Sequence, residues 1–149
     1  MTKEVIISIA GLQADMRDDK NEAVEVISFG SYYLKNGKHY VKYEEVNEEE
    51  HEITSSLLKF TNNKVEIKRQ GMLTANIEFE PGVKNVTCYH TQFGDITIGF
   101  ATDELDVHEE EDLIEIKIEY ELEVNGESTG SCSVMIKIEP QHRGFRIEK

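Results

Sequence analysis

Several features that would assign this sequence to a special class are scarce or missing. Cys88 and Cys132 are the only cysteines. They are too few for a disulfide framework and fit no metal-binding spacing, so we expect two buried, reduced thiols. Residues 1–15 show no basic region followed by an apolar run, and no stretch approaches the roughly 20 apolar residues of a membrane span. The sequence therefore predicts a soluble, untargeted protein, with the cytoplasm as its default location and no membrane as partner.

Positive charge is also scarce. Lysine and arginine total 16 against 30 aspartates and glutamates, for a net charge of −14. An acidic surface repels nucleic-acid backbones and anionic membranes, so neither is expected as a partner. Two acidic runs, residues 44–52 and 103–112, each contain one histidine, His51 or His108. We interpret both runs as solvated loops rather than metal sites, because neither has the order of Asp, Asn and Gly positions of a calcium loop.

Catalytic and cofactor motifs are missing as well. The sequence has no glycine-rich phosphate loop, no zinc spacing and no serine nucleophile elbow. Cys88 and His90 would share one face of a strand, but side chains two residues apart on a strand stand about 7 Å from each other, too far for a thiolate and its base. His142 has the chemistry of a haem ligand, yet nothing else in the sequence supports a haem. We predict no catalytic residues, no cofactor and no enzymatic activity.

Regular alternation is what the sequence does have, most clearly in residues 113–124 (LIEIKIEYELEV). The even positions are all apolar and the odd positions from 115 to 123 are all charged, which predicts a strand with one buried face. At about 3.4 Å per residue this strand would span roughly 40 Å, about twice the usual length. Burial of its apolar face would contribute about 9 to 18 kcal/mol, as an upper bound.

The next strand continues the same parity, because Cys132, Val134, Ile136 and Ile138 are its less polar residues. Directly opposed residues share a face, which requires an odd number of loop residues. We therefore predict a three-residue loop, residues 124–126, with Gly126 left-handed in a bulge. That register would pair Tyr120 with Gly130, Ile118 with Cys132, Ile116 with Val134 and Ile114 with Ile136.

The rest of the chain predicts eight more strands, at residues 4–12, 23–29, 38–45, 53–60, 64–70, 72–79, 85–91 and 96–102, with residues 30–35 leading from the second strand into the turn that follows. Residues 13–22 form a polar connection, and Asn36-Gly37 is a strong hairpin turn. Nearly all connections have hairpin length, which excludes parallel crossovers and predicts an antiparallel meander. Closure hides both edges, so we predict an all-β fold: a single antiparallel up-and-down β-barrel of about eight to ten strands. One domain covers residues 1–149, with residues 140–149 as a tail.

Short motifs along the chain also carry a family resemblance. They are GSYYLK (30–35), HYVKYEE (39–45), IKRQG (67–71), FGDI (93–96) and IEY (118–120). Their order and spacing resemble the YwiB-like family, small bacterial domains of unknown function, over almost the whole chain except its tail. The resemblance implies a calycin-like, or lipocalin-like, barrel. Small-molecule binding is implied only by analogy with better-known barrels of that fold, and no catalytic residue is carried over.

Arg69 and four tyrosines are the candidate site residues. Arg69 shares a face with Val65 and Ile67 by period two, which directs it toward the interior. There its guanidinium group has two possible roles. It donates to main-chain carbonyls and a carboxylate such as Asp95, as a structural clasp that closes the barrel, or it donates to an anionic or carbonyl group of a ligand. The candidate tyrosines, which suit a ligand-lined lumen and a packed core alike, are Tyr33, Tyr40, Tyr43 and Tyr120.

Two functions from different classes remain open. In the first, the barrel interior binds a small molecule without catalysis, with Arg69 and the tyrosines as polar contacts. In the second, the interior is filled and the chain is an interaction or assembly module, which pairs with a second copy through an acidic face or an unclosed edge. A barrel of this size permits either, because alternation shows which residues point inward and does not measure the volume between them.

Overall fold

The computed structural model describes residues 3–11, 25–47, 52–70, 75–91 and 94–141. The described residues form ten strands: β1 (Glu4–Ala10), β2 (Glu25–Lys35), β3 (Lys38–Asn47), β4 (Glu52–Phe60), β5 (Val65–Gln70), β6 (Ala75–Phe79), β7 (Lys84–Thr91), β8 (Gly94–Glu110), β9 (Leu113–Val124) and β10 (Glu127–Pro140). No helix in this part of the chain is long and apolar enough to cross a membrane. The predicted connection at 13–22 and the tail from residue 142 lie outside the described residues.

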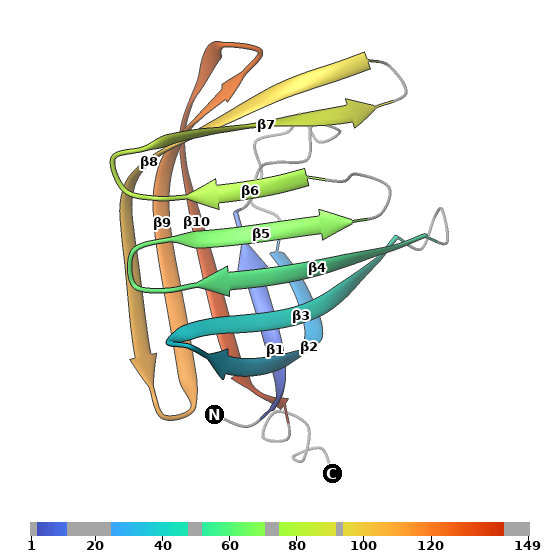
Figure 1. Cartoon of the computed structure of the whole chain (residues 1–149), viewed down its shortest axis with the longest axis vertical. Coiled ribbons are helices and arrows are strands. Elements are labelled where there is room, and N and C mark those ends of the chain that lie inside the picture. The colour runs from blue at the N-terminus through green and yellow to red at the C-terminus, as the bar shows by residue number, and fades with distance from the viewer. Residues whose placement is uncertain (1–2, 12–24, 48–51, 71–74, 92–93, 142–149) are drawn as a thin grey trace.

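All ten strands belong to one antiparallel sheet in the order β6-β5-β4-β3-β2-β1-β10-β9-β8-β7. The pairing of β1 with β10 brings the two ends of the meander together, and the sheet curls until its edge strands β6 and β7 lie next to each other (Figure 1). An isolated bridge between Glu80 and Val83 and a hydrogen bond from Asn85 Nδ2 to the main-chain oxygen of Glu78 connect these edges. The predicted up-and-down barrel is therefore confirmed, and it is nearly closed.

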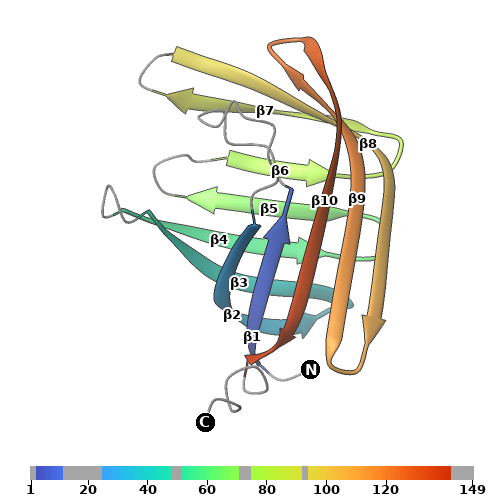
Figure 2. The ribbon, with the colours of Figure 1, turned by 180° about the vertical axis from the view of Figure 1, so that it is seen from behind.

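Two long strands turn the corners of the barrel. Residues 25–31 of β2 pair with β1, whereas residues 30–35 pair with β3, so β2 changes partner at Gly30. A Cβ atom at Gly30 would lie 2.8 Å from the main-chain oxygen of Lys42, which only a glycine avoids. Strand β8 likewise pairs first with β7 and then with β9. As a result β3–β7 run crosswise to β9, β10 and the second half of β8 (Figures 1 and 2).

The interior is packed with apolar side chains from every strand. On β9 the even positions from Ile114 to Leu122 are buried, as the alternation predicted. The rings of Phe79, Phe100 and Tyr120 lie 5.0 to 5.6 Å apart inside the barrel, and all three are fully buried. Each such side chain contributes about 1.5 to 3 kcal/mol by leaving water. Burial of these inward faces therefore stabilises the barrel.

The β9–β10 hairpin differs from its prediction. Asn125 and Gly126 form a two-residue turn with φ values of 51° and 88°, and Val124 pairs with Glu127. A bulge between Ser128 and Gly130 then supplies the extra residue that returns the apolar set to the interior. The predicted three-residue loop is wrong, and the register is displaced by two residues: Tyr120 faces Cys132, Ile118 faces Val134, Ile116 faces Ile136 and Ile114 faces Ile138.

The second acidic run is also not a loop. Strand β8 continues to Glu110, and Leu105 and Val107 pack partly buried against the core. A bulge at Asp103 shifts the alternation by one residue, which is why a pattern that ends at Thr102 resumes on odd positions. The first run is partly strand as well, because β3 reaches Asn47, while residues 48–51 lie outside the described residues.

Neither cysteine is in a disulfide, and the predicted burial of both thiols is wrong: Cys88 is exposed and Cys132 is half-buried. No group of histidine, cysteine, aspartate and glutamate in the described part of the chain is placed to hold a metal ion.

Candidate functional site

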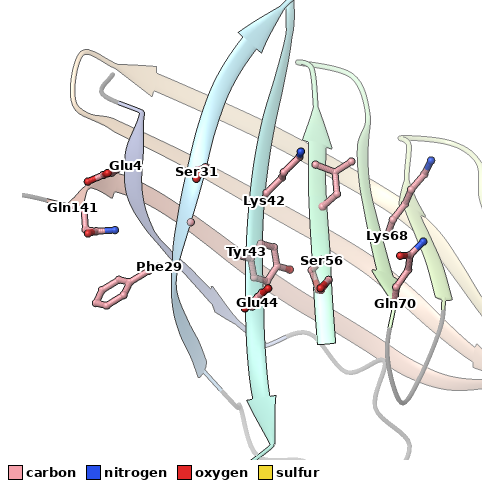
Figure 3. A pocket seen from close by; sticks show the side chains of 13 residues that line it. Glu4, Phe29, Ser31, Lys42, Tyr43, Glu44, Ser56, Lys68, Gln70 and Gln141 are labelled. Carbon is pink, nitrogen blue, oxygen red and sulfur yellow. The ribbon is translucent and has the colours of Figure 1, made fainter. Parts of the chain in front are cut away.

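A groove of about 740 Å³ crosses β1–β5 on the outside of the barrel. Its outward position follows from alternation on β3, where Val41 and Tyr43 are buried and their neighbours Lys42 and Glu44 are exposed. Figure 3 shows Lys42 and Lys68 pointing to the same side of the strands. Volumes of this size are typical of small-molecule sites.

Two cross-strand rows of side chains line the groove. In the first row, successive register partners run from β1 to β5: Glu4, Ser31, Lys42, Leu57 and Lys68. The second row lies two residues away along each strand and contains Phe29, Glu44, Ser55 and Gln70. With Gln141, which also lines the groove, the lining combines two ammonium groups, two carboxylates, hydroxyls and two amides with apolar surface from Leu57 and Phe29.

The groove spans the place where the sheet divides. The β2–β3 ladder ends at the pair Gly30 and Tyr43. Beyond it Phe29 pairs with Ile6 of β1, whereas Glu44 pairs with Ser55 of β4, so the two strands separate. The chain cannot keep β2 paired with both β1 and β3 along its full length while it turns the corner. The split is therefore a consequence of the barrel's curvature.

Within the described strands, no acidic partner holds the two groove lysines. Among the described residues, neither Lys42 nor Lys68 has a carboxylate within ion-pair distance. Lys42 instead places its Nζ 5.9 Å from the ring centre of Tyr33, which stacks on Tyr40 with ring centres 5.0 Å apart. Lys59 lies over the other ring at 5.8 Å. Cation–π contacts of this kind are worth about 0.5 to 1 kcal/mol at exposed sites.

A polar cluster lies on the inner side of the same strands. Arg69 Nη2 donates to Glu45 Oε1 at 2.9 Å, with both side chains largely buried. The buried Arg69 Nε has no hydrogen-bond partner in the described part of the chain. Burial raises the pKa of the nearby Tyr43 hydroxyl far above its ordinary value, the Glu45 carboxylate raises it further, and the Arg69 charge opposes them. The Arg69–Glu45 pair has the form of a clasp, which is one of the two roles left open for Arg69, with Glu45 in place of Asp95 as the carboxylate. Asp95 is exposed at the start of β8.

The five predicted site residues do not form one site. Arg69 and Tyr43 lie together on the inner wall, and Tyr120 is inside but deep in the apolar cluster. Tyr33 and Tyr40 lie on the outer face, so their predicted place in the lumen is wrong. The alternation of the sequence is consistent with this outward position, because Tyr33 follows the buried Tyr32 and Tyr40 precedes the buried Val41. The groove residues were missed because their proximity depends on the strand split.

Comparison with known proteins places this fold in a family. Residues 7–136 match the model of a family described as Domain of unknown function (DUF1934). The chain is 28% identical over 115 residues to the "Uncharacterized beta-barrel protein YwiB" of Bacillus subtilis (strain 168), which covers 75% of this chain and 78% of that protein. The crystal structure of ywiB protein from Bacillus subtilis has the same fold, with a TM-score of 0.74 and 21% identity over 93% of this chain and 92% of that one. The chain belongs to the DUF1934 family, which confirms the resemblance found in its sequence motifs.

Proposed function

We propose that this protein binds a small molecule without catalysis, and that the ligand occupies the outer groove at the β2–β3 split. The groove's volume of about 740 Å³ carries the proposal, because it lies within the range of about 300 to 1,000 Å³ of small-molecule sites. Its few ammonium, amide and hydroxyl groups around Leu57 and Phe29 suit recognition. The barrel interior supports binding less well, because its inward side chains bury one another.

Titration of the ¹⁵N-labelled protein with a library of small organic compounds tests this proposal. Compounds that bind should shift the amide signals of groove residues such as Lys42 and Leu57. Ser55→Trp would fill the groove with an indole ring and should abolish these shifts. Ser133→Trp is the matched control, because Ser133 is also exposed on the outer face of a strand, on β10. Binding that shifts interior residues, or that survives Ser55→Trp, would contradict the proposal.

An assembly module is the second candidate, and a specific patch favours it. Ile27 and Phe29 on β2 are 63% and 60% exposed, and Met135 on β10 is exposed beyond β1. Exposed apolar residues gathered on one face are typical of contact surfaces. Under this proposal the patch pairs with a second copy of the chain. Sedimentation equilibrium should then show a dimer that Ile27→Asp dissociates; a monomer at every concentration would exclude it.

A further inference from the structure

We infer that the ligand of the groove is a small organic anion with an apolar body, and that Lys42 and Lys68 hold its anionic group above Leu57. This inference rests on the proposed function, because it assigns chemistry to the same groove. The three residues are consecutive in one cross-strand row: Lys42 lies opposite Leu57, which lies opposite Lys68. An apolar side chain is thus flanked by two cations.

The spacing of the strands allows both lysines to act on one group. Adjacent strands lie about 4.8 Å apart, which places the Cα atoms of Lys42 and Lys68 roughly 10 Å from each other. A lysine carries its ammonium group on a flexible four-carbon stem of about 6 Å, so both groups reach a point above Leu57. Neither lysine has a carboxylate partner among the described residues, so an anion binds there without breaking an ion pair.

The distribution of surface charge favours an anion at the lysine end of the groove. The chain has a net charge of −14. The outward face of β9 shows the usual composition of its surface: Glu115, Glu119, Glu121 and Glu123 against the single Lys117. On the outward face of β3–β5, by contrast, three lysines, Lys42, Lys59 and Lys68, outnumber two carboxylates, Glu44 and Glu66. An anion is therefore repelled by the acidic face and attracted to the lysine face.

The remaining lining residues orient the ligand. Glu44 lies two residues from Lys42 on the same face, about 7 Å along the strand, so it disfavours an anion near itself and accepts from a hydroxyl or amino group. Glu4 ends the row two strands from Lys42. The anionic group is thus favoured on the Lys68 side. Phe29, at the other end of the groove, offers an exposed ring for the apolar body.

Two fluorescent probes of the same shape test the assignment. 1-Anilinonaphthalene-8-sulfonate carries an anionic group on an apolar body, and N-phenyl-1-naphthylamine is the same body without the charge. Lys42→Gln/Lys68→Gln should weaken binding of the sulfonate at least tenfold and change binding of the neutral probe less than twofold. The matched control is Lys117→Gln/Lys137→Gln, which removes the same charge from exposed positions on β9 and β10 and should leave both affinities within twofold. Thermal melts confirm that each variant is folded.

The Ser55→Trp variant separates failure of this inference from failure of the proposed function. If both probes bind in a manner that Ser55→Trp abolishes, but the Lys42→Gln/Lys68→Gln variant binds the sulfonate as well as the parent does, the groove is a binding site and the anion assignment is wrong. If neither probe shows binding that Ser55→Trp abolishes, both the inference and the proposed function fail.

Discussion

Replacing Arg69 with methionine is expected to destabilise the protein by about 2 to 3 kcal/mol. Removing one member of a fully buried ion pair costs about 3 to 5 kcal/mol, because the remaining charge stays desolvated. The Arg69 and Glu45 side chains keep 17% and 21% of their exposure, so water relieves part of that cost. For a chain of this length, each 1 kcal/mol lowers the melting temperature by about 2 to 4 °C.

Urea unfolding at neutral pH measures this loss directly. Glu45→Gln in the Arg69→Met background should recover much of it, because no charge is then left buried. The matched control is Lys84→Met, which breaks an ion pair with Glu123 of similar length, 3.1 Å, around a half-exposed lysine. Its expected cost is below about 1 kcal/mol. If Arg69→Met costs no more than this control, the structural clasp is refuted, and a recognition role for Arg69 is favoured.

Further predictions concern the core, the corner and the pH dependence. Ile116→Ala should lower the free energy of unfolding by about 2 to 5 kcal/mol, because it leaves a cavity in the core. Ile27→Ala, at an exposed position, should change it by less than about 0.5 kcal/mol. Equal effects of the two variants on urea unfolding would contradict the inward and outward assignments. Gly30→Ala should cost about 1 to 3 kcal/mol, because its Cβ would press on the Lys42 main-chain oxygen, and an unchanged melting temperature would contradict the close approach. In the folded state the pKa of Tyr43 lies above its ordinary value of 10.0. The contribution of the protonated hydroxyl to the free energy of unfolding is therefore complete below that pH, and it falls by up to about 1.4 kcal/mol per pH unit above it. Tyr43→Phe should therefore flatten the loss of stability between about pH 9 and pH 11; identical slopes in urea titrations would refute this.

The strands and their faces could be predicted because alternation depends only on local sequence. The even positions of β9 are buried as expected, and the up-and-down order followed from connections of hairpin length. Two wrong predictions, the register of β9 with β10 and the loop at residues 103–112, both fall at bulges. At Asp103 and Thr129 one extra residue shifts the parity, and such an insertion depends on how neighbouring strands twist rather than on the residues themselves.

The candidate site was less predictable. Arg69 was correctly directed inward, but its partner Glu45 lies on β3, with β4 between them, and the sequence does not show which carboxylate a curled sheet brings near. The groove depends on the change of partner by β2 at Gly30. Alternation shows which face a residue is on, and it does not show where a strand exchanges one neighbour for another. Sites at such corners therefore need the three-dimensional structure.

Native mass spectrometry of protein purified from the cells that make it tests whether a small molecule occupies the outer groove. We predict an added non-covalent mass of roughly a few hundred daltons, the size that a site of this volume holds. The parent and Ser133→Trp should carry it, and Ser55→Trp should not. An equal added mass on Ser55→Trp would place the ligand elsewhere, and the mass of the chain alone in all three samples would contradict small-molecule binding.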